Sequence, residues 1–115
     1  MITIYHNPRC SKSREALALL EQHSDEPLTV INYMKTPPTS TELAEILARL
    51  NIPARNLLRT KEAEYTKLQL SNAALTEQQL IKAMTEHPKL IERPIVINGE
   101  RAAIGRPLSN ISAIL

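Results

Sequence analysis

The chain has 115 residues, a length that suits one compact domain and is too short for two independently stable ones. Hydrophobic residues make up 43% and charged residues 23%, which is ordinary globular usage and excludes a disordered or fibrous chain. The formal net charge is only +2, and there are three tyrosines but no Phe or Trp, so the basic surface with stacking aromatics that single-stranded nucleic acids require is hard to assemble.

Targeting and membrane signals are equally weak. The N-terminal MITIYHNPRC has no basic segment before a long apolar run, and the longest apolar stretches fall far short of the roughly 18 residues of a membrane span. The single cysteine cannot form an internal disulfide, which fits a reducing compartment. We therefore expect a cytoplasmic protein without a membrane partner.

The first elements predicted are a strand, a helix and a second strand. Residues 2–5 are β-branched and aromatic and end at the turn signal formed by residues 6–8. Residues 11–23 are rich in helix formers and carry apolar residues on one face, and residues 28–33 (LTVINY) read as a strand. Cys10 therefore lies where a loop after a strand enters a helix.

The middle of the chain is predicted to be helical. Thr39 is the expected N-cap of a helix, and Glu42 completes a capping box. This helix has a buried face at i, i+3, i+4, i+7 spacing, made by Leu43, Ile46, Leu47 and Leu50. Residues 55–70 indicate one or two short helices, and Thr76 with Gln79 begins another.

The C-terminal part predicts a hairpin and a last short helix. Two β-type runs, residues 95–97 and 102–104, flank Asn98-Gly99, which favours a type I′ turn. Residues 109–115 read as the helix. Because a helix joins the first two strands, they should be parallel, whereas the hairpin is antiparallel. The expected fold class is α/β, with a mixed sheet covered by helices.

The strongest candidate for chemistry is Cys10, within HNPRCSKSR. A thiol at a helix N-terminus faces the positive end of the helix dipole and unpaired N–H groups, and Arg9, Lys12 and Arg14 add nearby positive charge. These effects together could lower the pKa of the thiol from about 8.5 into the range of roughly 3.5 to 7.5. The sequence thus predicts a nucleophilic thiolate.

The same loop suits an oxyanion, because N–H groups at a helix start and the Ser11 and Ser13 hydroxyls can donate hydrogen bonds to it. A lone cysteine in such a domain is more often a small buried apolar residue. Against that interpretation, Cys10 follows a turn and has no apolar neighbour on either side.

Arginines form a second candidate group. Arg93 and Arg106 directly precede proline, which favours extended backbone at both, and Arg59 ends the segment NLLR. Guanidinium groups match tetrahedral oxyanions with paired hydrogen bonds, so converging arginines could clamp an anion. Most arginines are simply solvated surface residues, and spacing alone does not select these three.

The histidines and glycines add little. His6 could orient or polarise the thiol four residues later, or could make an ordinary loop hydrogen bond. His23 and His87 fall at predicted helix C-termini, where the dipole accounts for them. No His and Cys cluster has metal-ligand spacing, and Gly99 and Gly105 cannot form a glycine-rich phosphate loop.

Three motifs carry a family resemblance: YHNPRCSKSR, then NLLR followed by EAEY, then HPKLIERPIVINGERAAIGRP. In this order they cover nearly the whole chain, which resembles the glutaredoxin-linked ArsC-type arsenate reductases, and especially their short chromosomal forms. The larger group also contains the Spx regulators. The resemblance implies a thioredoxin-like fold, as one domain over residues 1–115 with a helical subdomain at about 37–90.

The resemblance also implies roles for individual residues. Cys10 would attack arsenate, and the oxyanion would be bound by Arg59, Arg93 and Arg106, with His6 and Ser13 in support. Glutathione, a co-substrate rather than a bound cofactor, and then glutaredoxin would reduce the arsenylated cysteine and release arsenite. No metal is implied. Pro94 matches the position of the cis-proline of thioredoxin-like folds.

One departure leaves alternatives open. The loop reads CSKS where well-studied arsenate reductases of this type have a Gly-Thr spacer. The resemblance therefore specifies the thiol chemistry more closely than it specifies the substrate. A glutathione-dependent thiol oxidoreductase with another substrate is the second hypothesis, and a non-catalytic Spx-like adaptor is the third. Spx regulators carry a C-x-x-C switch, whereas position 13 here is Ser13.

Overall fold

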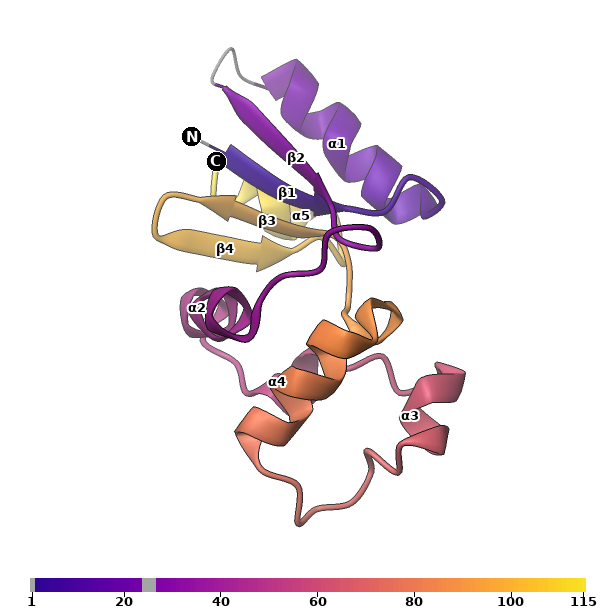
Figure 1. The fold of residues 1–115 in the computed structure, drawn as a ribbon. Helices are drawn as coiled ribbons and strands as arrows, with labels where there is room; N and C mark the ends of the chain where they lie inside the picture. The colour runs from indigo at the N-terminus through magenta and orange to yellow at the C-terminus, as the bar shows by residue number, and fades with distance from the viewer. Residues whose placement is uncertain (1, 24–26) are drawn as a thin grey trace. The chain divides into compact units, whose positions relative to one another are not determined.

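The computed structural model describes residues 2–23 and 27–115 and divides the chain into two compact units (Figure 1). Unit 1 comprises Met1–Thr36 and Arg93–Leu115, and unit 2 comprises Pro37–Glu92. In the part of the chain that the structure describes, no helix has the length and apolar character needed to cross a membrane.

Unit 1 is built on a four-stranded sheet with strand order β2-β1-β3-β4. Strands β1 and β2 are parallel, whereas β3 is antiparallel to both β1 and β4. This confirms the predicted α/β class and mixed sheet. The elements of unit 1 are β1 (Ile2–His6), α1 (Ser11–His23), β2 (Leu28–Asn32), β3 (Ile95–Asn98), β4 (Arg101–Ile104) and α5 (Ser109–Ser112).

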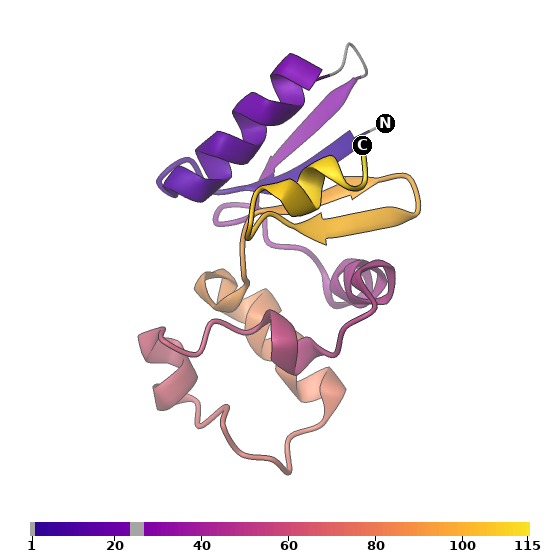
Figure 2. The same ribbon diagram turned by 180° about the vertical axis from the view of Figure 1, so that it is seen from behind.

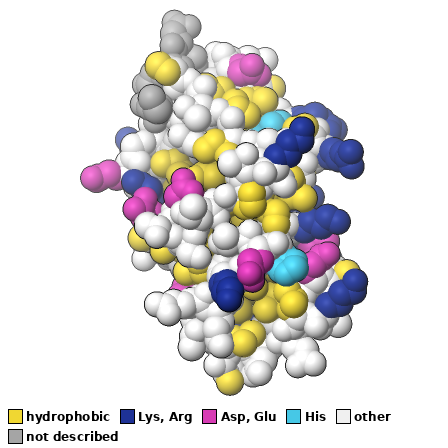
Figure 3. Space-filling view, in the orientation of Figure 1, with side chains coloured by type: hydrophobic (Ala, Val, Ile, Leu, Met, Phe, Trp, Pro, Cys, Tyr) yellow, Lys and Arg dark blue, Asp and Glu magenta, His cyan; other side chains and the backbone are white. Residues whose placement is uncertain are grey.

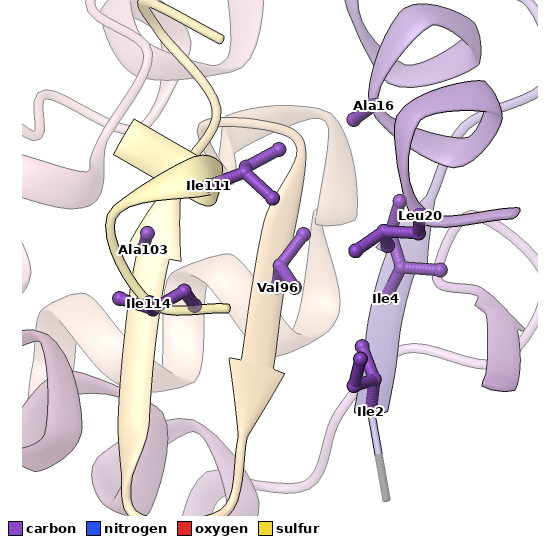
Figure 4. Packing of buried hydrophobic residues seen from close by; sticks show 8 residues of the cluster. All are labelled: Ile2, Ile4, Ala16, Leu20, Val96, Ala103, Ile111 and Ile114. Carbon is purple, nitrogen blue, oxygen red and sulfur yellow. The ribbon is translucent and has the colours of Figure 1, made fainter. Parts of the chain in front are cut away.

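The core of unit 1 lies on the face of the sheet that α1 and α5 cover (Figures 2 and 4). Ile4, Val96 and Ala103 are cross-strand partners on three neighbouring strands, so they form one apolar row across the sheet. The helices add Ala16 and Leu20 from α1, and Ile111 and Ile114 from the C-terminal segment. This packing holds α1 and the C-terminal segment against the sheet.

The hairpin turn differs from the predicted type. Asn98 pairs with Arg101, so the two loop residues are Gly99 and Glu100 rather than Asn98 and Gly99. Gly99 has φ +62°, while neither Asn98 nor Glu100 has positive φ, which is the pattern of a type II′ turn. The shift has a long-range cause: the Asn98 side chain donates to the Ile114 carbonyl at 2.7 Å and so stays in the strand.

Unit 2 is helical, and its two long helices begin as predicted. Thr39 and Glu42 form a reciprocal capping box, with N–H to oxygen distances of 2.9 and 3.1 Å, and Thr76 with Gln79 forms another. The predicted helical region 55–70 contains one 3₁₀ turn and one short α-helix. The elements are α2 (Ser40–Leu50), η1 (Ala54–Leu57), α3 (Ala63–Lys67), α4 (Glu77–Glu86) and η2 (Pro88–Leu90).

Candidate active site

The register of the sheet brings four chain segments to one edge of unit 1. The parallel strands β1 and β2 both end there, with His6 opposite Asn32 in the last pair. The antiparallel β3 begins at this edge, because Ile95 pairs with Tyr5, and β4 ends there, because Ile104 pairs with Ile95. The residues that lie just beyond these strand ends are Asn7, Cys10, Tyr33, Arg93 and Arg106.

Cys10 occupies the capping position of α1. Its carbonyl accepts the Arg14 N–H at 3.0 Å, and its own N–H donates to the Asn7 carbonyl at 3.0 Å. The backbone N–H groups of Lys12 and Ser13 point at the sulfur. The sulfur therefore takes the place of the side-chain oxygen that usually caps a helix, where the dipole favours negative charge.

Two arginines from distant parts of the chain reach this sulfur. Arg106 places Nη2 3.6 Å from Cys10 Sγ and donates from Nε to the Arg93 carbonyl at 2.7 Å. The Arg93 side chain also interacts with the thiol. Both the predicted cis bond at Arg93–Pro94 and a second one at Arg106–Pro107 are present. The structure thus brings together three of the predicted site residues.

The acidity of the thiol results from opposing effects. Burial raises the pKa of Cys10, which is only 7% exposed. The Ser13 N–H, the Arg93 guanidinium and the Lys12 N–H lower this pKa and together outweigh burial. The pKa of the thiol is therefore below its ordinary value, which favours the thiolate as the sequence predicts.

The source of the positive charge differs from the prediction. Arg9, Lys12 and Arg14 are exposed, and Figure 3 shows Lys and Arg side chains on the side of unit 1 where the β1–α1 loop lies in Figure 1. Lys12 pairs with Glu15 at 3.8 Å and Arg14 donates to the Pro8 carbonyl at 2.9 Å. The cation that acidifies the thiol is instead Arg93, 83 positions later in the chain.

Titration of Cys10 tests this assignment. Its alkylation by iodoacetamide, a neutral reagent, should inflect clearly below the free-thiol pKa of about 8.5. Arg93→Gln should move the inflection to higher pH, because the charge that stabilises the thiolate is lost. Arg9→Gln is the matched control and should leave the inflection in place. Equal inflections for Arg93→Gln and the unmodified chain would contradict the assignment.

His6 and Ser13 form a support for the loop. Ser13 Oγ lies 2.6 Å from His6 Nδ1 and accepts the Asn7 N–H at 2.9 Å. Burial and the charge of Arg14 lower the pKa of His6, so a neutral ring is favoured. Of the two interpretations that the sequence leaves open for His6, the observed contact is a hydrogen bond that holds the loop carrying Cys10.

Arg59 belongs to unit 2. Its N–H donates to the Leu90 carbonyl at 2.7 Å, next to a bridge between Leu58 and Ile91. Its guanidinium lies 3.5 Å from the Glu62 carboxylate. The role of Arg59 as a substrate ligand stays a prediction.

Tyr33 is a residue at this edge of the sheet that the sequence does not single out as a site residue. The predicted strand includes it, but β2 ends at Asn32, and Tyr33 opens a turn in which Asn32 accepts the N–H groups of Met34 and Thr36. The parallel register of β1 and β2 places Tyr33 at the site, because Asn32 pairs with His6 and the next residues of the two strands, Tyr33 and Asn7, therefore lie side by side.

Gly105 keeps the Arg106 segment in place. Its N–H donates to the Pro94 carbonyl at 2.9 Å, and a Cβ here would lie 2.8 Å from both Pro94 Cγ and Ile111 Cδ1. The proline ring is rigid and cannot yield as a flexible side chain does. Only glycine fits this approach.

We expect Gly105→Ala to lower the free energy of unfolding by about 1–3 kcal/mol through overpacking, measured by urea denaturation. Ser112→Ala changes an exposed position nearby and should stay within about 0.5 kcal/mol of the unmodified chain. An unchanged urea midpoint for Gly105→Ala would show that the segment relaxes at no cost.

The described part of the chain offers no set of side chains that would bind a metal ion. Among residues 2–23 and 27–115, no group of three or more His, Cys, Asp and Glu side chains could hold a metal ion.

Comparison with known proteins relates this site to a family. The chain matches the ArsC family over residues 5–114. Arsenate reductases from Neisseria meningitidis and Haemophilus influenzae are each 47% identical to it over 115 residues, covering 99% of this chain and 97% and 98% of theirs. The structure of an arsenate reductase from Vibrio cholerae is 45% identical, with a TM-score of 0.94 over 99% of this chain and 97% of that one.

Proposed function

Because the chain belongs to the ArsC family, we propose that it reduces arsenate to arsenite, with Cys10 as the nucleophile. The observation that carries the proposal is the arrangement at one sulfur of helix N–H groups and two arginines. An adaptor that only binds a protein needs neither an acidic thiol nor an anion clamp. The acidic thiol and the two arginines therefore favour an enzyme over the Spx-like adaptor.

The first step joins substrate and protein. Arsenate carries multiple negative charges at neutral pH, so its approach to a thiolate is opposed unless cations offset the repulsion. Arg93 and Arg106 offset it next to the sulfur. Cys10 Sγ then forms a bond to arsenic, one arsenic–oxygen bond breaks, and that oxygen leaves as water after taking up protons.

The second step needs electrons from outside the chain, because Cys10 is its only cysteine. The glutathione thiol forms a bond to arsenic and displaces a further oxygen, which leaves as water. The glutaredoxin thiol then attacks the glutathione sulfur and forms a disulfide with it, which breaks the bond from that sulfur to arsenic. Two electrons pass to arsenic, which changes from As(V) to As(III), while the two external thiols become one disulfide. Water then hydrolyses the bond between Cys10 and As(III), which releases arsenite and restores the thiol of Cys10. Such thiol donors are kept reduced in the cytoplasm, which is where we place the protein.

A coupled assay tests the function. Arsenate-dependent NADPH oxidation is measured with the protein, glutathione, glutaredoxin and glutathione reductase, and omission of each component in turn shows which is required. We expect turnover only with all of them. Reduction of a glutathione mixed disulfide without any arsenate turnover would favour the second hypothesis, and no thiol chemistry at all would favour the adaptor.

A further inference from the structure

The proposed mechanism does not use the most deeply buried tyrosine of unit 1. Tyr33 is only 1% exposed, and its hydroxyl oxygen is buried with no hydrogen-bond partner among the described residues. A buried hydroxyl without a partner destabilises a folded protein, since water would otherwise bond to it. Phenylalanine would fill the same space without this penalty, so the hydroxyl calls for an explanation other than packing.

The position of this hydroxyl points to the anion site. Tyr33 follows β2 directly as Asn7 follows β1, so the two are neighbours at the edge where the loop to Cys10 begins. The side chains of Asn7 and Arg93 approach the hydroxyl, and the charge of Cys10 acts on it. None of these groups meets it with hydrogen-bond geometry. An unused donor therefore lies beside the arginine that faces the sulfur.

We propose that the Tyr33 hydroxyl donates a hydrogen bond to an oxygen of the tetrahedral oxyanion bound at Cys10. The inference rests on the proposed function and adds to it a neutral member of the anion site. The bound oxygen supplies the partner that the hydroxyl lacks in the ligand-free protein. Arg93 holds the same anion by charge, from the adjacent position.

The electrostatics of the site suit a neutral donor. Burial raises the pKa of Tyr33 to about 12, with a further contribution in the same direction from the charge of Cys10, while Arg93 and Asn7 act against it. The phenol therefore keeps its proton across the pH range of any assay. Because a protonated phenol carries no charge that could act on the thiolate, replacing Tyr33 by Phe should weaken oxyanion binding without changing the acidity of the thiol.

Protection of Cys10 from alkylation measures this binding without turnover. The rate of iodoacetamide modification is followed at rising arsenate concentration, and the half-protecting concentration is compared between proteins. We expect Tyr33→Phe to raise that concentration by about tenfold or more, the scale of a lost hydrogen bond to a charged group. Tyr65→Phe, the same change in unit 2, should leave it unchanged.

Two further readings separate this role from a structural one. Without arsenate, Tyr33→Phe should alkylate with the same pH inflection as the unmodified chain, and its melting temperature should be equal or higher. A lower melting temperature with unchanged protection would mean that the hydroxyl serves the fold, and equal protection alone would overturn the inference. If arsenate fails to protect even the unmodified chain, the proposed function fails first.

Discussion

Cys10→Ser is expected to lower arsenate-dependent NADPH oxidation by roughly 10³-fold or more, to the background of the coupled assay. A serine hydroxyl keeps its proton at neutral pH, and no group in the described site is placed to take that proton from it. The N–H groups and Arg106 would then face a neutral oxygen. Neither arsenic–sulfur bond formation nor transfer of electrons to an external thiol can follow.

The same substitution should leave the fold intact. Cys10 stands at the N-cap of α1, where serine is among the most favoured residues, so the helix start keeps an acceptor for its N–H groups. We expect a urea midpoint close to that of the unmodified chain, which serves as the control for activity loss. Substantial arsenate reduction by a folded Cys10→Ser protein would remove Cys10 from the mechanism.

Arg106→Lys should lower kcat/KM for arsenate by about tenfold to a hundredfold. Arg106 donates from Nε to a backbone carbonyl and presents Nη2 to the sulfur, a geometry that needs a planar, forked group. Lysine keeps the positive charge but cannot make both contacts at once. The loss corresponds to one charge-assisted hydrogen bond, about 1.5–3 kcal/mol.

Arg101→Lys provides the matched control, since Arg101 is exposed at the other end of β4, beside the hairpin turn. Steady-state kinetics of both variants with arsenate, in the same coupled assay, should show a loss only for Arg106→Lys. Equal kcat/KM values for the two variants would mean that positive charge alone suffices near Cys10, and the paired geometry would lose its assigned role.

Local signals in the sequence were enough for most of the fold. The capping boxes at Thr39 and Thr76 identify two helix starts because both of their hydrogen bonds join residues three apart. The hairpin was found but its turn type was wrong, since the contact that keeps Asn98 in the strand comes from Ile114, sixteen residues later. Sequence neighbours cannot reveal such a contact.

The difference between local and long-range contacts also explains which site residues could be predicted from the sequence. Cys10 was found from its own surroundings, because a thiol before a helix is a local arrangement. The cation that acidifies it was assigned to the adjacent basic residues, whereas the structure gives that role to Arg93. Arg93 and Arg106 were selected by family resemblance, since only the sheet register brings them to this edge. Tyr33 required the same register and was therefore missed.

The bond from Arg106 Nε to the Arg93 carbonyl has a consequence for how the two arginines can vary. A carbonyl belongs to the main chain and persists whatever side chain stands at position 93. The backbone at position 93 therefore sets the direction of the Arg106 guanidinium, and the Arg93 side chain can be replaced without changing that direction. Substrate preference at this site can therefore be altered at position 93 while the guanidinium of Arg106 keeps its direction.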